Sequence, residues 1–404
     1  MSRIMVSGVF LLAISGVFLL GTVRNNIALT LNGDELIQPT EAEAGEGADV
    51  QAPVAVNPNL DIEPQKPLEN PPQIIKALYS TAWSASSAKK IDYFINFMKD
   101  TELNALVVDI KDYSGTVAYR MDVEAVKKYG ADKSIKITKI NSLIKKLHDN
   151  GIYAIARIAV FQDPILAKNR PEIALQSIAT GKTWEDKKGL EWVDPASKEA
   201  WDYNISIAQD ALNRGFDEVN FDYVRFASDG NMKDARYPVW DGKTPKHTVI
   251  KNFFEYLRNS LGTAKISLDL FGLVTVNHDD LGIGQKMEDA FPYADAIAPM
   301  VYPSHYMKGF AGYQSPAKYP YEIVYKSMSD AQERLDKYLN STTTPPTNVP
   351  QLRPWLQDFD LGAIYTADKI EAQIHATEAA ATSTPMGWML WDPANTYTTG
   401  VFPR

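Results

Sequence analysis

The feature that most constrains the fold is an alternation of short apolar segments with longer segments of helical periodicity, which begins at residue 74. The apolar segments of strand length, eight in number, lie at 74–81, 105–112, 153–160, 218–226, 265–272, 296–303, 352–358 and 387–392. The helical patterns lie between them, at 88–100, 138–149, 197–213, 247–261, 285–292, 322–338 and 366–380. Eight strands that alternate with helices predict an α/β fold, a (β/α)8 TIM barrel.

A doubly wound parallel sheet would show the same alternation. No glycine-rich phosphate loop follows the first predicted strand, which disfavours a nucleotide-binding sheet of that kind. The barrel would carry long βα loops at 161–196, 227–246 and 304–321, each of which contains tryptophan or tyrosine. Because βα loops build the active face of a TIM barrel, we expect these aromatic residues near the site.

An apolar run of 20 residues, Ile4 to Val23, stands at the N-terminus between Arg3 and Arg24. Its length suffices to cross a bilayer and exceeds the apolar core of about 7–15 residues in a cleaved signal peptide. We interpret residues 1–24 as a signal anchor, with a cleaved signal peptide as the alternative. Either one exports the rest of the chain, which would be held at the membrane by the anchor or secreted after cleavage.

Residues 25–73 differ in composition from everything that follows. They contain nine acidic residues, one lysine and seven prolines, so much of the net charge of −9 is concentrated there. High charge and low hydrophobicity predict an acidic, proline-rich, disordered linker, which leaves 74–404 for the barrel. The acidic balance disfavours a nucleic-acid partner, and the lack of cysteine excludes disulfides and thiolate metal sites.

Polar side chains interrupt the predicted strands in their middle or C-terminal parts. Strands of a TIM barrel are apolar on both faces, so such residues indicate a functional site at the C-terminal face. The residues that we place there as substrate-binding groups, together with nearby loop residues, are Asp109, Lys111, Arg157, Asn220, Arg225, Tyr302, His305 and Trp391. Along the second strand, Asp109 and Lys111 have the same parity and should share a face.

Two carboxylates stand out as the predicted catalytic pair, Asp222 in the fourth strand and Asp269 in the fifth. Adjacent strands lie about 4.8 Å apart, a separation that suits glycoside hydrolysis by a nucleophile or base and a general acid. Burial and a nearby arginine can split the two pKa values, so that one carboxyl is ionised and the other protonated. This chemistry requires no cofactor, and no metal-ligand spacing such as HExxH is present.

Several stretches of the sequence carry a resemblance to a known family: VVDIKDYSG (107–115), IARIAVFQDP (155–164), GFDEVNFDYVRF (215–226), SLDLFG (267–272), IGQ (283–285), APMVYPSHY (298–306) and RPWLQDF (353–359). Through them the sequence resembles a bacterial family of glycoside hydrolases, long catalogued as a domain of unknown function and related to α-amylase-type barrels. The resemblance implies a (β/α)8 barrel that hydrolyses polysaccharides. It also implies that Asp222 matches the nucleophile of that group, whereas its acid is a Glu at the end of strand five, where this chain offers Asp269.

We therefore predict an exported glycoside hydrolase that acts on a polysaccharide or oligosaccharide through Asp222 and Asp269. One alternative is a non-catalytic glycan-binding barrel tethered at the cell envelope, which needs the aromatic residues but not both carboxylates. Another is a carboxylate-based hydrolase such as a deacetylase, which would be expected to need a metal.

Overall fold

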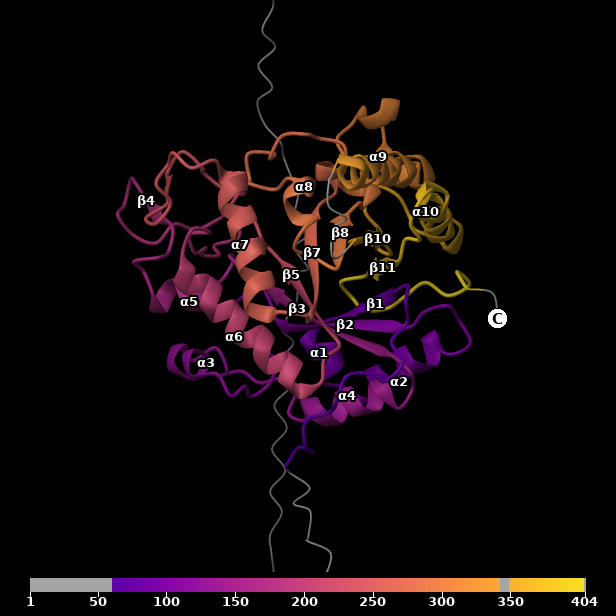
Figure 1. Ribbon diagram of the computed structural model, residues 1–404, viewed down its shortest axis with the longest axis horizontal. Coiled ribbons are helices and arrows are strands. Elements are labelled where there is room, and N and C mark those ends of the chain that lie inside the picture. Colours follow the sequence, from indigo (N-terminus) through magenta and orange to yellow (C-terminus); the bar gives the residue numbers. More distant parts are fainter. Residues whose placement is uncertain (1–59, 342–348, 403–404) are drawn as a thin grey trace, which may run out of the picture. The chain divides into compact units, whose positions relative to one another are not determined.

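Parallel strands close into a barrel in the computed structural model, which describes residues 60–341 and 349–402 (Figure 1). The strands are β1 (Lys76–Ser80), β2 (Ala105–Lys111), β3 (Tyr153–Ala159), β5 (Glu218–Asp222), β7 (Lys265–Phe271), β8 (Ala296–Met300), β9 (Gln351–Leu352), β10 (Trp355–Gln357) and β11 (Trp388–Trp391). Their order is β10-β11-β1-β2-β3-β5-β7-β8-β9, and pairing of β10 with β8 closes the ring. Since β9 and β10 form one interrupted strand, the barrel has eight positions, and the predicted fold is confirmed.

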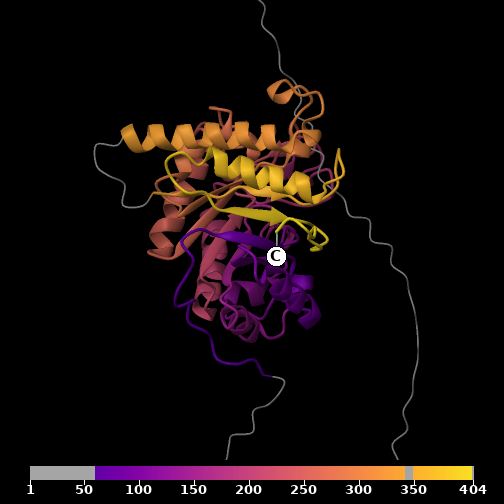
Figure 2. The same ribbon diagram turned by 90° about the vertical axis from the view of Figure 1, so that its right-hand side faces the viewer.

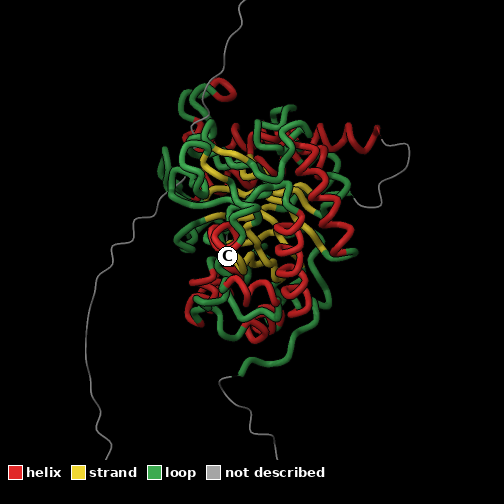
Figure 3. The backbone as a smooth tube through the Cα atoms, turned by 90° about the vertical axis from the view of Figure 1, so that its left-hand side faces the viewer, coloured by secondary structure: helices red, strands yellow, loops and turns green. Residues whose placement is uncertain are grey.

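The helices surround the strands as an outer layer (Figures 1 and 3). Those that connect successive strands are α2 (Ala88–Met98), α4 (Ile140–His148), α6 (Lys198–Arg214), α7 (Lys246–Leu261), α8 (Met287–Ala290), α9 (Pro320–Ser341) and α10 (Ala367–Ala380). Figure 2 shows α9 and α10 packed side by side. Each predicted helical pattern corresponds to a helix, although 285–292 is reduced to the single turn of α8.

The βα loops contain short elements that the periodicity does not predict. They are α1 (Ala82–Ala85), α3 (Glu124–Tyr129), α5 (Pro164–Asn169), the antiparallel pair β4 (Gln176–Ser177) and β6 (Ala235–Arg236), and the 3₁₀ turns η1 (Gly272–Thr275), η2 (Pro303–His305), η3 (Phe310–Gly312) and η4 (Pro316–Lys318). The β4–β6 pair joins the βα loop that follows β3 to the βα loop that follows β5.

Alternation along the strands separates two apolar layers. Even-numbered residues of β1 and β2, such as Leu78 and Leu106, face the helices in the larger cluster. Odd-numbered residues, such as Tyr79 and Val107, fill the barrel interior. In β3, Arg157 follows Ile155 on the interior face. The polar residues picked out in the strands therefore belong to the inside of the barrel wherever this parity holds.

The last part of the predicted linker packs against the barrel. Residues 61–73, which we call the strap, belong to the same compact unit as the barrel, which begins at Asp61. The Asp61 carboxylate accepts backbone hydrogen bonds from Asn141 (2.7 Å) and Ser142 (3.0 Å) in the first turn of α4. The Leu68 N–H donates to Asp217 Oδ1 at 2.6 Å. Prolines and acids suggested disorder, but these contacts hold the strap against α4 and the residue before β5.

The absent side chain of Gly215 helps the strap to approach the barrel. Gly215 ends α6 in the left-handed region, with φ 104°, and a Cβ there would lie 2.4 Å from the Gln65 carbonyl oxygen. The rest of the predicted linker and the apolar run at 4–23 lie outside the described residues. Within the ranges that the structure describes, none of the helices has the length and apolar character needed to cross a bilayer.

Candidate functional site

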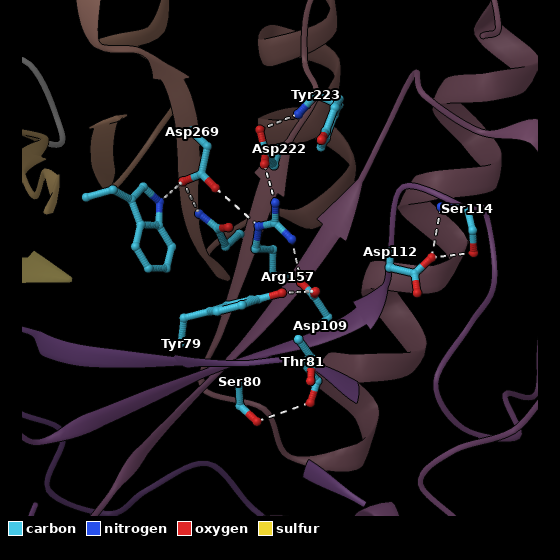
Figure 4. Close-up of polar contacts among 12 residues, drawn as sticks. Tyr79, Ser80, Thr81, Asp109, Asp112, Ser114, Arg157, Asp222, Tyr223 and Asp269 are labelled. Carbon is cyan, nitrogen blue, oxygen red and sulfur yellow. Dashed lines mark hydrogen bonds and ion pairs between the residues drawn. The ribbon is translucent and has the colours of Figure 1, made fainter. Parts of the chain in front are cut away.

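Arg157 lies at the centre of a polar cluster inside the barrel (Figure 4). Strand register brings its partners to one level, because Arg157 pairs with Asp109 on one side and with Asn220 on the other. We call the group the Arg157 cluster, and it consists of Tyr79, Asp109, Arg157, Asn220, Asp222, Asp269, Trp355 and Trp391. Six of these eight residues are among the predicted site residues.

One guanidinium contacts three carboxylates. Arg157 Nη1 lies 2.5 Å from Asp109 Oδ1, Nη2 is ion-paired with Asp222 Oδ2, and Nε lies 3.5 Å from Asp269 Oδ2. Arg157 is 5% exposed and Asp269 1%, so water screens these charges poorly. Three ionised acids around one buried cation would be strongly unfavourable, and protonation of one acid relieves the repulsion.

Two aromatic rings fix the orientation of Arg157. Tyr79 and Trp391 stack with ring centroids 3.8 Å apart, and the guanidinium carbon lies 5.7 Å from the first ring and 5.1 Å from the second. The Tyr79 hydroxyl donates to Asp109 Oδ2 at 2.5 Å. Cation–π contact and this hydrogen bond leave the arginine little freedom to turn away from its acids.

Asp269 has the environment of an acid that keeps its proton. Its Oδ1 accepts hydrogen bonds from Asn220 Nδ2 (2.9 Å) and from Trp355 Nε1 (2.8 Å), whereas no hydrogen bond to its Oδ2 is found among the described residues. Burial raises the pKa of Asp269 to about 7, with a further rise from Asp222 that Arg157 opposes. Because both acceptor directions of Oδ1 are used, the proton belongs on Oδ2.

Asp222 is the last residue of β5 and stands beside Asp269. The final paired residues of the two strands are Phe221 and Leu268, so the next residue in each strand is one of the two acids. After Asp222 the chain turns sharply, because Tyr223 adopts φ 55°, a strained value for a residue with a side chain. The Tyr223 N–H donates to Asp222 Oδ1 at 2.6 Å, which holds the carboxylate at the C-terminal end of the strand.

Tyr302 and His305 lie on the opposite side of the barrel mouth from β2. Tyr302 packs against His305 and Phe359, with centroid distances of 5.3 Å and 5.7 Å. Burial, followed by Asp269 and Asp222, raises the pKa of Tyr302 well above its usual value. Burial lowers the pKa of His305 to about 4, so its ring is neutral at neutral pH. These aromatic residues present uncharged surfaces next to the acids.

Two predicted site residues stand apart from the cluster. Lys111 does not share a face with Asp109, because a bulge in β2 pairs it with the outward-facing Ile158. Its ammonium is completely buried and lies 2.8 Å from Asp163. Arg225 lies in an adjacent aromatic cage, with its guanidinium carbon 4.7 Å from both Trp192 and Phe271.

The tryptophans of the loop 161–196, which we expected near the site, are buried, with Trp192 at 0% and Trp184 at 2% exposure. Two cluster residues, Tyr79 and Trp355, were not predicted, because the predicted site rested mainly on charged and amide side chains within strands. Each carries a polar atom on an aromatic ring within a barrel strand, and this is the sequence signal that could have identified them.

A separate pocket of about 540 Å³ is lined by residues from the α2–β2 turn, α10 and the C-terminal segment, among them Glu102, His375 and Phe402. The turn precedes β2, so this pocket lies at the N-terminal end of the barrel, away from the Arg157 cluster. Within the described ranges no group of three His, Asp or Glu residues is arranged to hold a metal ion.

Comparison with known proteins gives a family match and several similar structures. A family model described as "putative glycosyl hydrolase domain" matches residues 77–397. No curated protein matches the sequence. The glycoside hydrolase domain of PgaB (BpsB) from Bordetella bronchiseptica has a similar structure, with 12% identity, a TM-score of 0.54, and coverage of 80% of this chain and 95% of that one.

Two further solved structures are similar. Alpha-L-fucosidase isoenzyme 2 from Paenibacillus thiaminolyticus shares 12% identity at a TM-score of 0.52, covering 81% of this chain and 47% of its own. A hypothetical protein from Ruminiclostridium thermocellum ATCC 27405 shares 37% identity at a TM-score of 0.44, covering 51% of this chain and 98% of its own. At such low identities, the first two structural matches support the barrel fold alone.

Proposed function

The chain belongs to the family described as putative glycosyl hydrolase domains, a family of glycan-acting hydrolases, and on that premise we propose a mechanism built on Asp222 and Asp269. Asp269 donates its proton to the glycosidic oxygen, and Asp222 acts at the anomeric carbon. The proposal rests on one observation, which is that Arg157 interacts much more closely with Asp222 than with the neighbouring Asp269. Asp222 forms a close ion pair, whereas Asp269 Oδ2 lies 3.5 Å from Arg157 Nε and has no hydrogen bond from any described residue. The pKa of Asp269 is raised to about 7.

The short distance between neighbouring strands favours retention of anomeric configuration. Retaining enzymes hold their carboxyl groups about 5–5.5 Å apart, and inverting enzymes hold them about 6.5–9.5 Å apart to admit a water. Both acids here contact the same guanidinium, which leaves little room for a water between them. Asp222 is then the nucleophile, and Asp269, after giving up its proton, serves as the base that activates water in the second step.

Access to the acids requires movement of side chains at the barrel mouth. Asp222 is 6% exposed and Asp269 only 1%, so a sugar ring cannot reach Oδ2 without displacing neighbours. The sugar must also compete with Arg157 for Asp222, which ties catalysis to substrate binding. We propose export as well, on the strength of the 20-residue apolar run at the N-terminus, so that the substrate is an extracytoplasmic glycan.

The test uses variants of the two acids on aryl glycosides with different leaving groups. With 4-nitrophenyl glycosides, Asp222→Asn and Asp269→Asn should each lower kcat/KM by about 10²–10⁴-fold. With 2,4-dinitrophenyl glycosides, whose leaving group needs no protonation, only Asp222→Asn should remain inactive. Asp92→Asn, which changes an exposed carboxylate on α2, is the control. Equal activity of Asp222→Asn and wild type would refute the assignment.

The stereochemical proposal has its own readout. Proton NMR of the first sugar released should show the same anomer as the substrate, and appearance of the opposite anomer would assign Asp222 as a base instead. Export is tested separately by fusing residues 1–73 to a reporter enzyme that is active only outside the cytoplasm. A silent fusion with intact cytoplasmic expression would rule out export.

A further inference from the structure

Trp83 projects from the C-terminal face of the barrel and is 67% exposed. It is the only tryptophan in the described part of the chain with most of its surface in solvent. A lone apolar side chain on a surface needs no explanation. The rigidity of its support and its position beside the site set Trp83 apart.

The helix that carries Trp83 is a single turn fixed at several points. Thr81 caps α1, since its Oγ1 accepts a hydrogen bond from the Ser84 N–H at 3.1 Å. The N–H and hydroxyl of Thr81 both donate to Asn395 Oδ1, at 2.9 Å and 3.0 Å. Ala82 and Ala85 are buried, so the turn can point Trp83 only outward. The backbone that carries the indole is therefore held in place before any ligand arrives, which lowers the entropic cost of binding.

The same support belongs to the candidate active site. Asn395 is completely buried and donates from Nδ2 to the Tyr79 carbonyl at 3.2 Å. Tyr79 in turn donates to Asp109 in the Arg157 cluster. Figure 4 shows Thr81 on the Asp109 side of this cluster. Trp83 thus stands two residues beyond a segment that is bonded to the proposed catalytic machinery.

A second exposed aromatic residue follows the neighbouring strand. Tyr113 lies in the loop after β2, the strand that pairs with β1, and it is 50% exposed. Its pKa is raised by partial burial, then by the negative charges of Asp112 and Asp109. Trp83 and Tyr113 therefore share one side of the barrel mouth.

The group of Tyr302, His305 and Phe359 occupies the other side. In the strand order, β8 stands four positions from β2 and hence opposite it across the barrel. A linear ligand that contacts both sides must pass over the acids between them. A single sugar cannot do this, but a chain of several sugars can.

We propose that Trp83, together with Tyr113, forms an outer sugar-binding subsite, and that the substrate is a polysaccharide cleaved within its chain. This inference rests on the proposed function of Asp222 and Asp269. The apolar C–H face of a pyranose would stack on the indole. Lys136, whose ammonium lies 5.8 Å from the centre of the Trp83 ring system, would donate a hydrogen bond to a ring substituent.

Binding is measured first, in an inactive background. Asp222→Asn protein is run through affinity gels that contain glycol chitosan, laminarin, soluble starch or hyaluronan, and the polymer that retards it most is used further. Adding Trp83→Ala should weaken binding by about 2–12-fold in Kd, the value of one aromatic stack. Trp83→Tyr should recover part of the loss. Tyr325→Ala, which removes an exposed ring from α9, is the matched control and should bind normally.

Turnover provides the second measurement. In the otherwise native chain, Trp83→Ala should lower kcat/KM on that polymer by a similar factor and leave kcat/KM on aryl monoglycosides within about twofold of wild type. Equal loss on both substrates, or none on either, would overturn the outer subsite. So would a failure of all four polymers to retard Asp222→Asn protein. Persistent cleavage by Asp222→Asn would instead overturn the proposed mechanism, and the binding result for Trp83 would still stand.

Discussion

Arg157 defines the site because it is a single buried cation among three acids. Its guanidinium is held by two rings and reaches Asp109, Asp222 and Asp269 with different nitrogens. Removal of this arginine should therefore destabilise the folded protein strongly. An acid left alone in a barrel interior keeps its desolvation penalty and loses the charge that compensated for it.

The first prediction concerns replacement of this arginine. Arg157→Met should reduce the free energy of unfolding at pH 7 by about 3–5 kcal/mol, because breaking a buried ion pair leaves uncompensated charge. Arg157→Lys should recover little of that loss, since an ammonium cannot reach three carboxylates in the same geometry. Urea denaturation measures both variants. Arg170→Met, at a half-buried surface ion pair, is the control and should lose about 1 kcal/mol or less. A comparable loss at both positions would contradict the proposed role of burial.

The second prediction concerns pH and Asp269. Its pKa in the folded protein is about 7, against about 3.9 in an unfolded chain. Because the folded value is the higher one, the stabilising effect of the protonated form is complete below about pH 4 and is lost as pH rises to about 7. Relative to Asp269→Asn, wild-type stability should therefore decline over this range and level off above it. Thermal unfolding of the two proteins across pH 4–9 measures the difference.

The pH dependence of kcat/KM should reflect the same proton on Asp269. Wild-type kcat/KM should fall as pH rises above about 7, because Asp269 then loses the proton that it must donate. With 2,4-dinitrophenyl glycosides this alkaline limb should disappear. An alkaline limb that is unchanged for such substrates would assign it to another group.

Parity along strands was sufficient to predict most of this cluster. Asp109, Arg157, Asn220, Asp222 and Asp269 all occupy interior positions, as their spacing indicated. Lys111 does not occupy an interior position, because a bulge after Asp109 reverses the parity of the strand. No residue in that segment indicates the bulge. Tyr79 and Trp355 were not predicted, since an aromatic residue in a strand is ordinarily apolar core and neither, unlike Trp391, stands next to an acid in the sequence. Contacts between residues that are distant in sequence, such as Trp355 with Asp269, require the closed barrel.

At the scale of elements, the end of β7 controls how closely β8 approaches Asp269. Gly272 follows β7 directly, and a Cβ at this position would lie 2.4 Å from the Met300 carbonyl oxygen and 2.8 Å from the Tyr306 hydroxyl. Neither neighbour is free to withdraw, because Met300 belongs to the barrel and Tyr306 is bonded to Ser327 at 2.8 Å. Glycine is therefore required here for close packing.

The third prediction follows from this contact. Gly272→Ala should destabilise the protein by about 1–3 kcal/mol through overpacking, and it should also lower kcat because Asp269 lies three residues earlier on the same strand. Gly151→Ala is the matched control. Its Cβ would meet nothing within 4 Å, but its φ of 68° strains alanine. This control should lose about 1–2 kcal/mol of stability without loss of kcat. Full activity of Gly272→Ala would show that β7 tolerates the shift.

Long elements were predictable and short ones were not. Every strand and connecting helix was found within a few residues, since hydrophobic periodicity accumulates over a whole segment. The one-turn helix α1 and the β4–β6 pair gave no periodic signal, because a few residues cannot establish one. Yet α1 carries Trp83, so hydrophobic periodicity could not predict the element that holds the proposed outer subsite.

At the scale of the molecule, composition did not indicate that the strap packs against the barrel. The strap is as rich in proline and acid as the residues before it. It nonetheless supplies a capping group to a helix about 80 positions away. The N-terminal N–H groups of a helix need acceptors, and a carboxylate there also interacts favourably with the helix dipole. Asp61 meets both needs for α4, and this role appears only when the chain is folded.

The last prediction tests whether the strap is part of the folded unit. Deleting residues 1–73 should lower the unfolding midpoint relative to deletion of residues 1–60, because the first deletion removes both the α4 cap and the Leu68 contact with Asp217. In the full chain, Asp61→Ala should cost about 0.5–2 kcal/mol, the usual value of an N-terminal cap. Asp61→Asn keeps an acceptor but not the charge, so it should lie between Asp61→Ala and wild type. Glu63→Ala, an exposed acid in the same segment, should have no effect. Equal midpoints for the two deletions would mean that the barrel folds without the strap, and the domain would then begin at residue 74.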